Sequence, residues 1–186
     1  MKKYFLISMI AIALIGCNFA STEQVKEGSK AEVIDFDKRL KDLGIILAAP
    51  SVPLASYVKT VRVGNLMYTA GHGPDKPDGS RLTGRVGEDL TLEQGQEAAR
   101  LTAISLLSSL KAELGDLNKV KRIVKVLGMV QSAPDFKDQP KVMNAFSDLM
   151  VEVFGEKGKH ARSAVGMASI PANWAIEIEM VVEVED

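Results

Sequence analysis

The sequence predicts an α+β domain in which helices pack on one face of a single β-sheet. In residues 55–186, two short β-branched runs precede the first helical pattern, another β-branched run separates the two helical patterns, and an alternating apolar strand comes last. The resulting order of elements is β-β-α-β-α-β. Such an order, without strict strand and helix alternation, is typical of a sheet whose helices lie on one side.

Length and composition limit the function classes that fit this fold. A chain of 186 residues suits one domain with extensions and can bury a sizeable core. Hydrophobic residues make up 46% and charged residues 25%, as in an ordinary globular protein. The 23 basic and 24 acidic residues give a net charge of -1 and the aromatic residues are few. This balance argues against broad polyanion binding, so we expect no nucleic acid partner.

The N-terminus carries the pattern of a targeting signal. Lys2 and Lys3 precede an apolar run from Tyr4 to Ile15, which only Ser8 interrupts. This run is too short to span a bilayer as a mature helix. It therefore predicts a secretory signal.

The apolar run ends in Leu14-Ile15-Gly16-Cys17, which resembles the lipobox of bacterial lipoproteins. In those proteins the signal is cleaved before the cysteine, whose sulfur receives a diacylglycerol. Residues 1–17 are thus predicted to be a signal peptide that ends at a lipidation site, Cys17, the single cysteine of the sequence. We expect an exported protein of the bacterial cell envelope, anchored to the membrane through this lipid, on the periplasmic side in a Gram-negative cell. An ordinary signal peptide with a chance cysteine is the alternative.

A polar stretch follows the lipidation site. Residues 18–31 lack helical or strand periodicity and would reach at most about 45 Å when extended. Phe36, Leu40 and Leu43 then recur at helical spacing before Gly44, which predicts a short amphipathic helix. We assign residues 18–54 to a tether that includes this helix, and residues 55–186 to the core domain.

The first half of the core domain is predicted as a hairpin, a loop and a helix. The runs YVKTVRV and LMYTA flank Gly64-Asn65, a two-residue turn whose residues tolerate positive φ. The glycine-rich segment 71–87 lacks the Gly-Lys-Ser/Thr ending of a phosphate-binding loop, which argues against nucleotide binding. Thr91 and Gln94 then form a capping-box pattern, and the helix that follows is expected to end at Gly115.

The second half is predicted as a strand, a helix and two strands. Residues 120–130 form a β-branched run that suits a buried strand, and Pro140 fits the first turn of a second helix. Residues 164–168 and 175–184 are expected to be strands. In the last strand one face carries Ile176, Ile178, Met180, Val182 and Val184, and the other carries Glu177, Glu179, Val181 and Glu183. From this pattern alone, the second face could simply be solvated, and Arg162 could be a surface cation at a strand start.

Several motifs resemble one known family. Ala161-Arg162-Ser163, Ile170-Pro171 and Ile176-Glu177-Ile178-Glu179 are similar to the C-terminal signature of the Rid family, the reactive-intermediate deaminases also called the YjgF family. Other motifs appear in family order, namely Ser56-Tyr57-Val58, Gly64-Asn65, Thr69-Ala70-Gly71, Asp135-Phe136 and Asn144-Ala145. The resemblance covers about residues 55–184. It implies a chorismate-mutase-like fold and a homotrimer with sites in clefts between subunits.

The resemblance also implies a reaction: hydrolytic deamination of 2-imino acids and their enamine tautomers to 2-oxo acids and ammonia, without metal or cofactor. Arg162 would bind the substrate carboxylate, and Glu177 would position and activate the attacking water. Tyr57, Gly71 and Asn144 would line the pocket, and Ala164 would offer its backbone carbonyl to the water. These roles suit the residue types, because a guanidinium binds a carboxylate bidentately and a carboxylate can accept a proton from water.

The sequence departs from the archetypal deaminases near this pocket. Ala70 replaces a serine, His72 a glutamine and His160 a proline, and the stretch around 139–140 is longer. Two alternatives therefore remain open. One is a binding module for small carboxylate ligands at trimer interfaces that has lost catalysis. The other is RNA cleavage or translation inhibition, which the predicted export and the neutral charge disfavour. No metal site is expected, because the two histidines lack an evident third ligand.

We predict that Cys17→Ser prevents lipid attachment, because the thiol that accepts the diacylglycerol is gone. The precursor of this variant should also remain uncleaved by the lipoprotein peptidase. Metabolic labelling with a fatty acid in a bacterial host, followed by gel analysis of the precursor and mature forms, measures both effects. Persistent acyl labelling of the variant would refute the lipoprotein assignment.

Overall fold

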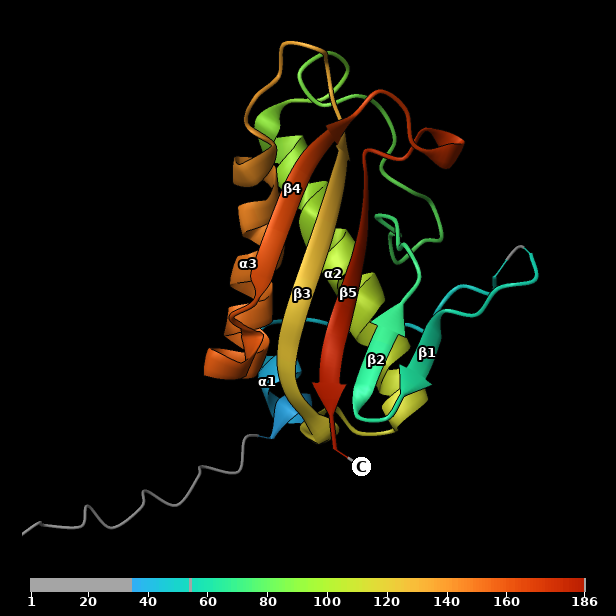
Figure 1. The fold of residues 1–186 in the computed structure, drawn as a ribbon. Coiled ribbons are helices and arrows are strands. Elements are labelled where there is room, and N and C mark those ends of the chain that lie inside the picture. The colour runs from blue at the N-terminus through green and yellow to red at the C-terminus, as the bar shows by residue number, and fades with distance from the viewer. Residues whose placement is uncertain (1–34, 54, 186) are drawn as a thin grey trace, which may run out of the picture. The chain divides into compact units, whose positions relative to one another are not determined.

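Five strands form one mixed sheet in the order β1-β2-β5-β3-β4, and α2 and α3 cover one of its faces (Figure 1). The computed structural model describes residues 35–53 and 55–185. The predicted signal peptide, Cys17 and most of the tether lie outside the described residues. The elements in chain order are α1 (Phe36–Asp42), β1 (Thr60–Val63), β2 (Leu66–Thr69), α2 (Leu92–Leu114), β3 (Val120–Gln131), α3 (Gln139–Phe154), β4 (Ala161–Met167) and β5 (Ile176–Val184). The predicted fold class is confirmed.

The hairpin turn and the helix start lie where the sequence places them. Val63 pairs with Leu66 across the turn, and Gly64 has a φ of 59°, which a residue without Cβ adopts readily. The Thr91 hydroxyl accepts a hydrogen bond from the Gln94 amide, and the Gln94 side chain accepts one from the Thr91 amide. This reciprocal cap fixes the first turn of α2.

Two strands have different limits from those predicted. The Tyr57 amide donates to the Ala55 carbonyl in a local turn, so β1 begins only at Thr60. Strand β4 begins at Ala161 rather than at 164, because its parallel pairing with β3 extends back to Lys125. Arg162 is therefore the second residue of this strand. The other neighbouring strands pair antiparallel, and α3 provides the crossover that a parallel pair requires.

The core lies between the sheet and the two long helices. The alternate residues of β5 from Ile176 to Val184 are nearly inaccessible, as the apolar pattern predicts. Helix α1 adds Phe36 and Leu40 to the same core, and the Phe36 and Phe154 rings lie 5.2 Å apart. Among the described residues, no helix is long and apolar enough to cross a membrane.

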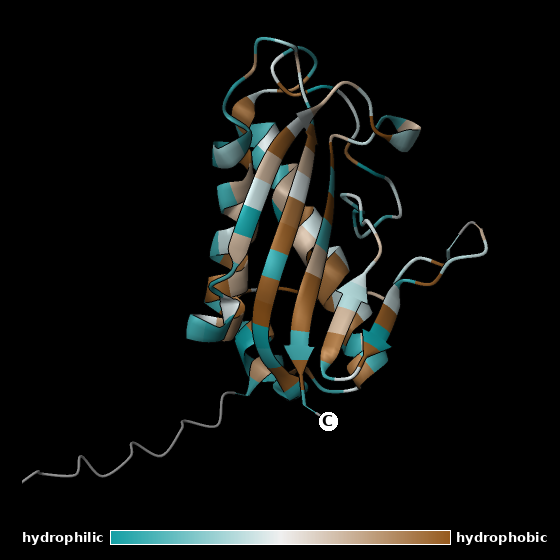
Figure 2. Cartoon of the chain, viewed as in Figure 1, coloured by the Kyte–Doolittle hydropathy of each residue, from teal (hydrophilic) through white to brown (hydrophobic). Residues whose placement is uncertain are grey.

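The other face of the sheet is uncovered by helices and is more apolar than a solvated face would be. Tyr68 pairs with Val61 on one side and Val181 on the other, so these side chains form a row across three strands. Exposed fractions are 45% for Tyr68, 51% for Val61 and 62% for Val63. Figure 2 shows apolar residues along most of β3 and much of β5. We call this surface the open face.

His72 fastens the segment after β2 to both the sheet and α2. Its backbone exchanges two hydrogen bonds with Ile178, of 2.9 and 3.0 Å. Its Nδ1 donates to the Ala70 carbonyl, and its Nε2 accepts from the Ser109 hydroxyl, 2.7 Å away. Burial lowers the pKa of His72 to about 4, so the ring is neutral near pH 7. The segment that carries Gly71 is thus held in one position.

Candidate active site

Glu177 and Gly71 lie against each other on the open face. Glu177 alternates with the buried Ile176 and Ile178, which directs its side chain away from the helices. A Cβ placed on Gly71 would overlap the carboxylate of Glu177. Only glycine allows this approach, so the structure brings together two of the residues that the family resemblance selected.

The surroundings of Glu177 favour its protonated form. Partial burial of the carboxyl raises the pKa of Glu177, and the negative charge of Glu179 raises it further. A carboxylate with a raised pKa is a stronger base when it is ionised. Glu177 is therefore suited to accept a proton from water.

Arg162 is fixed against α3 by three hydrogen bonds. Its register partner on β3 is Val126, which is fully buried under the helices. Because register partners point to the same face of a sheet, the Arg162 side chain also leaves the sheet on the helix side. Nη1 donates to the Ser147 hydroxyl at 2.9 Å, and Nη2 donates to the Asn144 side-chain oxygen at 3.1 Å and to the Pro140 carbonyl at 3.3 Å. Asn144, which the sequence analysis expects in the pocket, is thus a direct neighbour of Arg162.

These bonds determine how Arg162 could bind a carboxylate. A guanidinium offers two edges for bidentate binding, and each edge uses one Nη2 hydrogen. Both Nη2 hydrogens are engaged, with Asn144 and Pro140. A carboxylate must therefore replace one of these neutral oxygens. A carboxylate carries a full negative charge where these two oxygens are neutral, so the guanidinium attracts it more strongly.

Ser147 and His160 hold Arg162 in place through a chain of hydrogen bonds. His160 Nδ1 donates to the Gly158 carbonyl at 2.7 Å, which leaves Nε2 to accept from the Ser147 hydroxyl at 3.1 Å. The Ser147 oxygen then accepts from Arg162. Burial lowers the pKa of His160, and the positive charge of Arg162 lowers it further, which favours the neutral ring that this arrangement needs. We call Ser147 and His160 the Arg162 brace.

The sequence analysis missed the brace. His160 drew attention only as a departure from the archetype, and Ser147 drew none. The available hint was spacing, because Ser147 lies three residues after Asn144 and so shares its helix face.

Within one chain, the predicted site residues form two separate groups. Arg162 and Asn144 lie between β4 and α3, whereas Glu177 and Gly71 lie on the open face beyond β3. Ala164, on β4, pairs with Gly128 of β3. Tyr57 precedes β1, at the sheet edge opposite β4, and is 48% exposed. Among residues 35–53 and 55–185, no three His, Cys, Asp or Glu side chains are placed to hold a metal ion.

Comparison with known proteins finds similar chains. The family described as "YjgF/chorismate_mutase-like, putative endoribonuclease" matches residues 37–184. Protein TCP17 of Trypanosoma cruzi is 43% identical over 148 residues, which cover 79% of this chain and 92% of that protein. The 2-iminobutanoate/2-iminopropanoate deaminase of Dermatophagoides farinae is 30% identical over 134 residues, which cover 72% of this chain and 89% of that protein. The crystal structure of Atu1372, a protein with unknown function from Agrobacterium tumefaciens, has a TM-score of 0.75 at 43% identity, covering 81% of this chain and 94% of that chain.

We predict that Ser147→Ala weakens binding of a small carboxylate such as 2-oxobutanoate by about two- to tenfold, because Arg162 loses a hydrogen bond that orients it. Titration calorimetry measures the affinity. Ser163→Ala is the matched control, since its hydroxyl accepts from Lys125 and not from Arg162. Equal affinities of Ser147→Ala and the wild type would show that the brace does not support ligand binding.

Proposed function

Since the chain belongs to the YjgF/chorismate-mutase-like family, as its motifs predicted, we propose that it hydrolyses reactive 2-imino acids and their enamine tautomers to 2-oxo acids and ammonia. The observation that carries this proposal is the half-buried Glu177 carboxylate, whose pKa is raised and which is pressed against Gly71. The name of the Dermatophagoides farinae relative supports the same substrate class.

The proposed reaction uses two residues of the chain directly. Arg162 exchanges one of its acceptors on α3 for the substrate carboxylate and so fixes the imine carbon. Glu177 accepts a proton from water as the water oxygen attacks that carbon, which gives a tetrahedral carbinolamine. The nitrogen receives this proton and then the proton of the new hydroxyl group, both through Glu177, so ammonia leaves as the carbon–oxygen double bond forms. Water is the only co-reactant, and neither oxidation nor reduction occurs.

The other residues would shape the cleft. Ala164 would accept a hydrogen bond from the attacking water through its backbone carbonyl, while Tyr57 and Asn144 would line the pocket. Gly71 would leave the space that Glu177 and the water occupy. In this proposal the protein needs no cofactor.

The two groups of site residues require more than one subunit, and we therefore propose a homotrimer. Tyr57 and Arg162 lie at opposite edges of one sheet, so they can meet only where the β1 edge of one chain lies beside the β4 edge of another. The open face supports this assembly, because an apolar surface that includes Val61, Val63 and Tyr68 is the kind that a partner covers.

A non-catalytic binding module for small carboxylates is the second candidate. It is favoured by the three hydrogen bonds and the brace that fix Arg162, since these features serve binding whether or not Glu177 reacts. If Cys17 is lipidated, either activity would operate at the cell envelope.

We predict that Glu177→Gln lowers turnover by about 10²- to 10⁴-fold and leaves the affinity for 2-oxobutanoate nearly unchanged, because the amide cannot accept the proton. The assay is ammonia release from freshly generated 2-iminobutanoate, measured above the uncatalysed hydrolysis. A wild-type protein that binds 2-oxo acids without turnover would establish the binding module instead.

Glu179→Gln is the control for this assignment. Glu177 must be ionised to act as a base, so activity falls as the pH drops through its pKa. Because Glu179 raises that pKa, the Glu179→Gln variant should keep activity to lower pH than the wild type. If Glu179→Gln abolishes turnover while Glu177→Gln does not, the general base is misassigned.

We predict that the wild-type protein sediments as a trimer and that Tyr68→Glu dissociates it, because the new charge lies within the apolar row of the open face. Analytical ultracentrifugation measures the assembly state, and activity should disappear with the trimer. Ala112→Glu adds the same charge at an exposed position of α2 and should leave the trimer intact. A monomeric wild type would exclude both the trimer and the site between subunits.

A further inference from the structure

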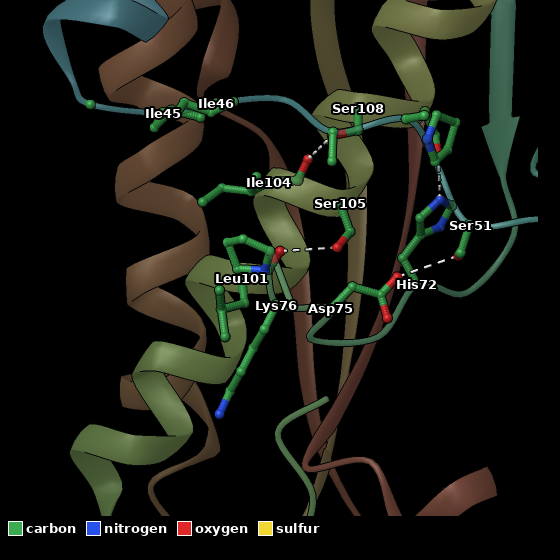
Figure 3. Close-up of a pocket in the computed structure, with 16 residues that line it drawn as sticks. Ile45, Ile46, Ser51, His72, Asp75, Lys76, Leu101, Ile104, Ser105 and Ser108 are labelled. Atoms are coloured by element: carbon green, nitrogen blue, oxygen red, sulfur yellow. Dashed lines mark hydrogen bonds between the residues drawn. The ribbon is translucent and has the colours of Figure 1, made fainter. Parts of the chain in front are cut away.

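A cavity of about 400 Å³ lies on the helix side of the sheet, apart from the proposed active site. Three segments line it, namely residues 44–51, the middle of α2 and residues 72–77 (Figure 3). None of the residues that line it is among those assigned to the deaminase site. Its volume falls within the range of small-molecule sites.

The walls of the cavity are mostly apolar. Residues 44–51 contribute Ile45, Ile46 and Pro50, and α2 contributes Leu101 and Ile104. Ile46 is 89% exposed, which is unusual for so large an apolar side chain beside a cavity. A ligand with a compact apolar body would cover such surface.

The serines of the cavity have no hydroxyl hydrogen to offer. Ser105 donates to the Leu101 carbonyl at 3.2 Å, Ser108 donates to the Ile104 carbonyl at 3.0 Å, and Ser51 donates to Asp75 at 3.3 Å (Figure 3). Ser109 donates to His72 Nε2, since His72 Nδ1 carries the ring hydrogen. Each hydroxyl oxygen keeps free lone pairs. The serines therefore present acceptors, and a ligand must supply the hydrogen.

Asp75 and Lys76 are the charged side chains that line the cavity, one of each sign, and Asp75 also pairs with Arg81. His72 is neutral near pH 7, because burial lowers its pKa. An anion would meet the Asp75 carboxylate, and a cation would meet Arg81 and Lys76, so an uncharged ligand is favoured.

We propose that this cavity is a second ligand site, which takes a small uncharged molecule with an apolar body and a hydroxyl or amide hydrogen-bond donor. The substrate proposed for the deaminase site differs from this class, since it carries a carboxylate. The two sites would therefore select different molecules.

Four probes that share one aromatic ring test the proposal. Benzyl alcohol is an uncharged donor, benzyl methyl ether is an uncharged acceptor, and benzoate and benzylammonium are charged. NMR titration of the ¹⁵N-labelled protein gives both the affinity and the location of binding. Benzyl alcohol should bind about two- to tenfold more tightly than the ether and more tightly than both ions, with amide shifts centred on residues 101–109.

The double substitution Ser105→Ala and Ser108→Ala should reduce the preference for the alcohol over the ether, because two of the four serine acceptor oxygens are removed. Alanine is a good helix former, so α2 should persist. Ser169→Ala, outside the cavity, is the control and should keep the preference. The proposal is overturned if the wild type binds the alcohol and the ether equally, if it binds either ion more tightly than the alcohol, or if the amide shifts are confined to other residues. These outcomes do not depend on whether the double variant folds.

Discussion

The pair of backbone hydrogen bonds between His72 and Ile178 joins the segment that carries Gly71 to the strand that carries Glu177, and both proposed sites depend on this link. Because neighbouring residues of an extended chain point to opposite faces, fixing His72 also fixes Gly71 and the direction of both. On the helix side the His72 ring bonds to Ser109, and both residues line the cavity. On the open face Gly71 limits the position of Glu177. One short segment thus shapes both proposed sites.

His72, which stands where the archetype has a glutamine, therefore has a structural role. A neutral imidazole has one donor and one acceptor, and His72 uses both, toward Ala70 and Ser109. His160 uses the same chemistry at the other end of the molecule, with Gly158 and Ser147 as its partners. In both places the ring connects a strand or loop backbone to a helix serine. The two departures from the family pattern act as structural links.

The sequence predicts those features of the fold that depend on residues close to one another in the chain. The turn at Gly64, the cap at Thr91 and the alternation of β5 each follow from residues close to one another in the chain, and the structure confirms all three. The Arg162 brace has no such pattern, because it joins α3 to β4 through side chains that meet only after packing. The cavity depends in the same way on where residues 44–51 cross α2. The roles of Arg162 and Glu177 come from family resemblance, and their separation in one chain was visible only once the strand order was known.

The positions of β1 and β4 at the two ends of the sheet have a further consequence. An edge strand presents backbone donors and acceptors to any other chain that can add a strand, and an apolar face beside it strengthens such contacts. A lone subunit would therefore be open to aggregation at the same places where the proposed trimer brings Tyr57 and Arg162 together. Rapid assembly would protect a newly folded chain. Catalytic competence and resistance to misassembly would then be acquired in a single step.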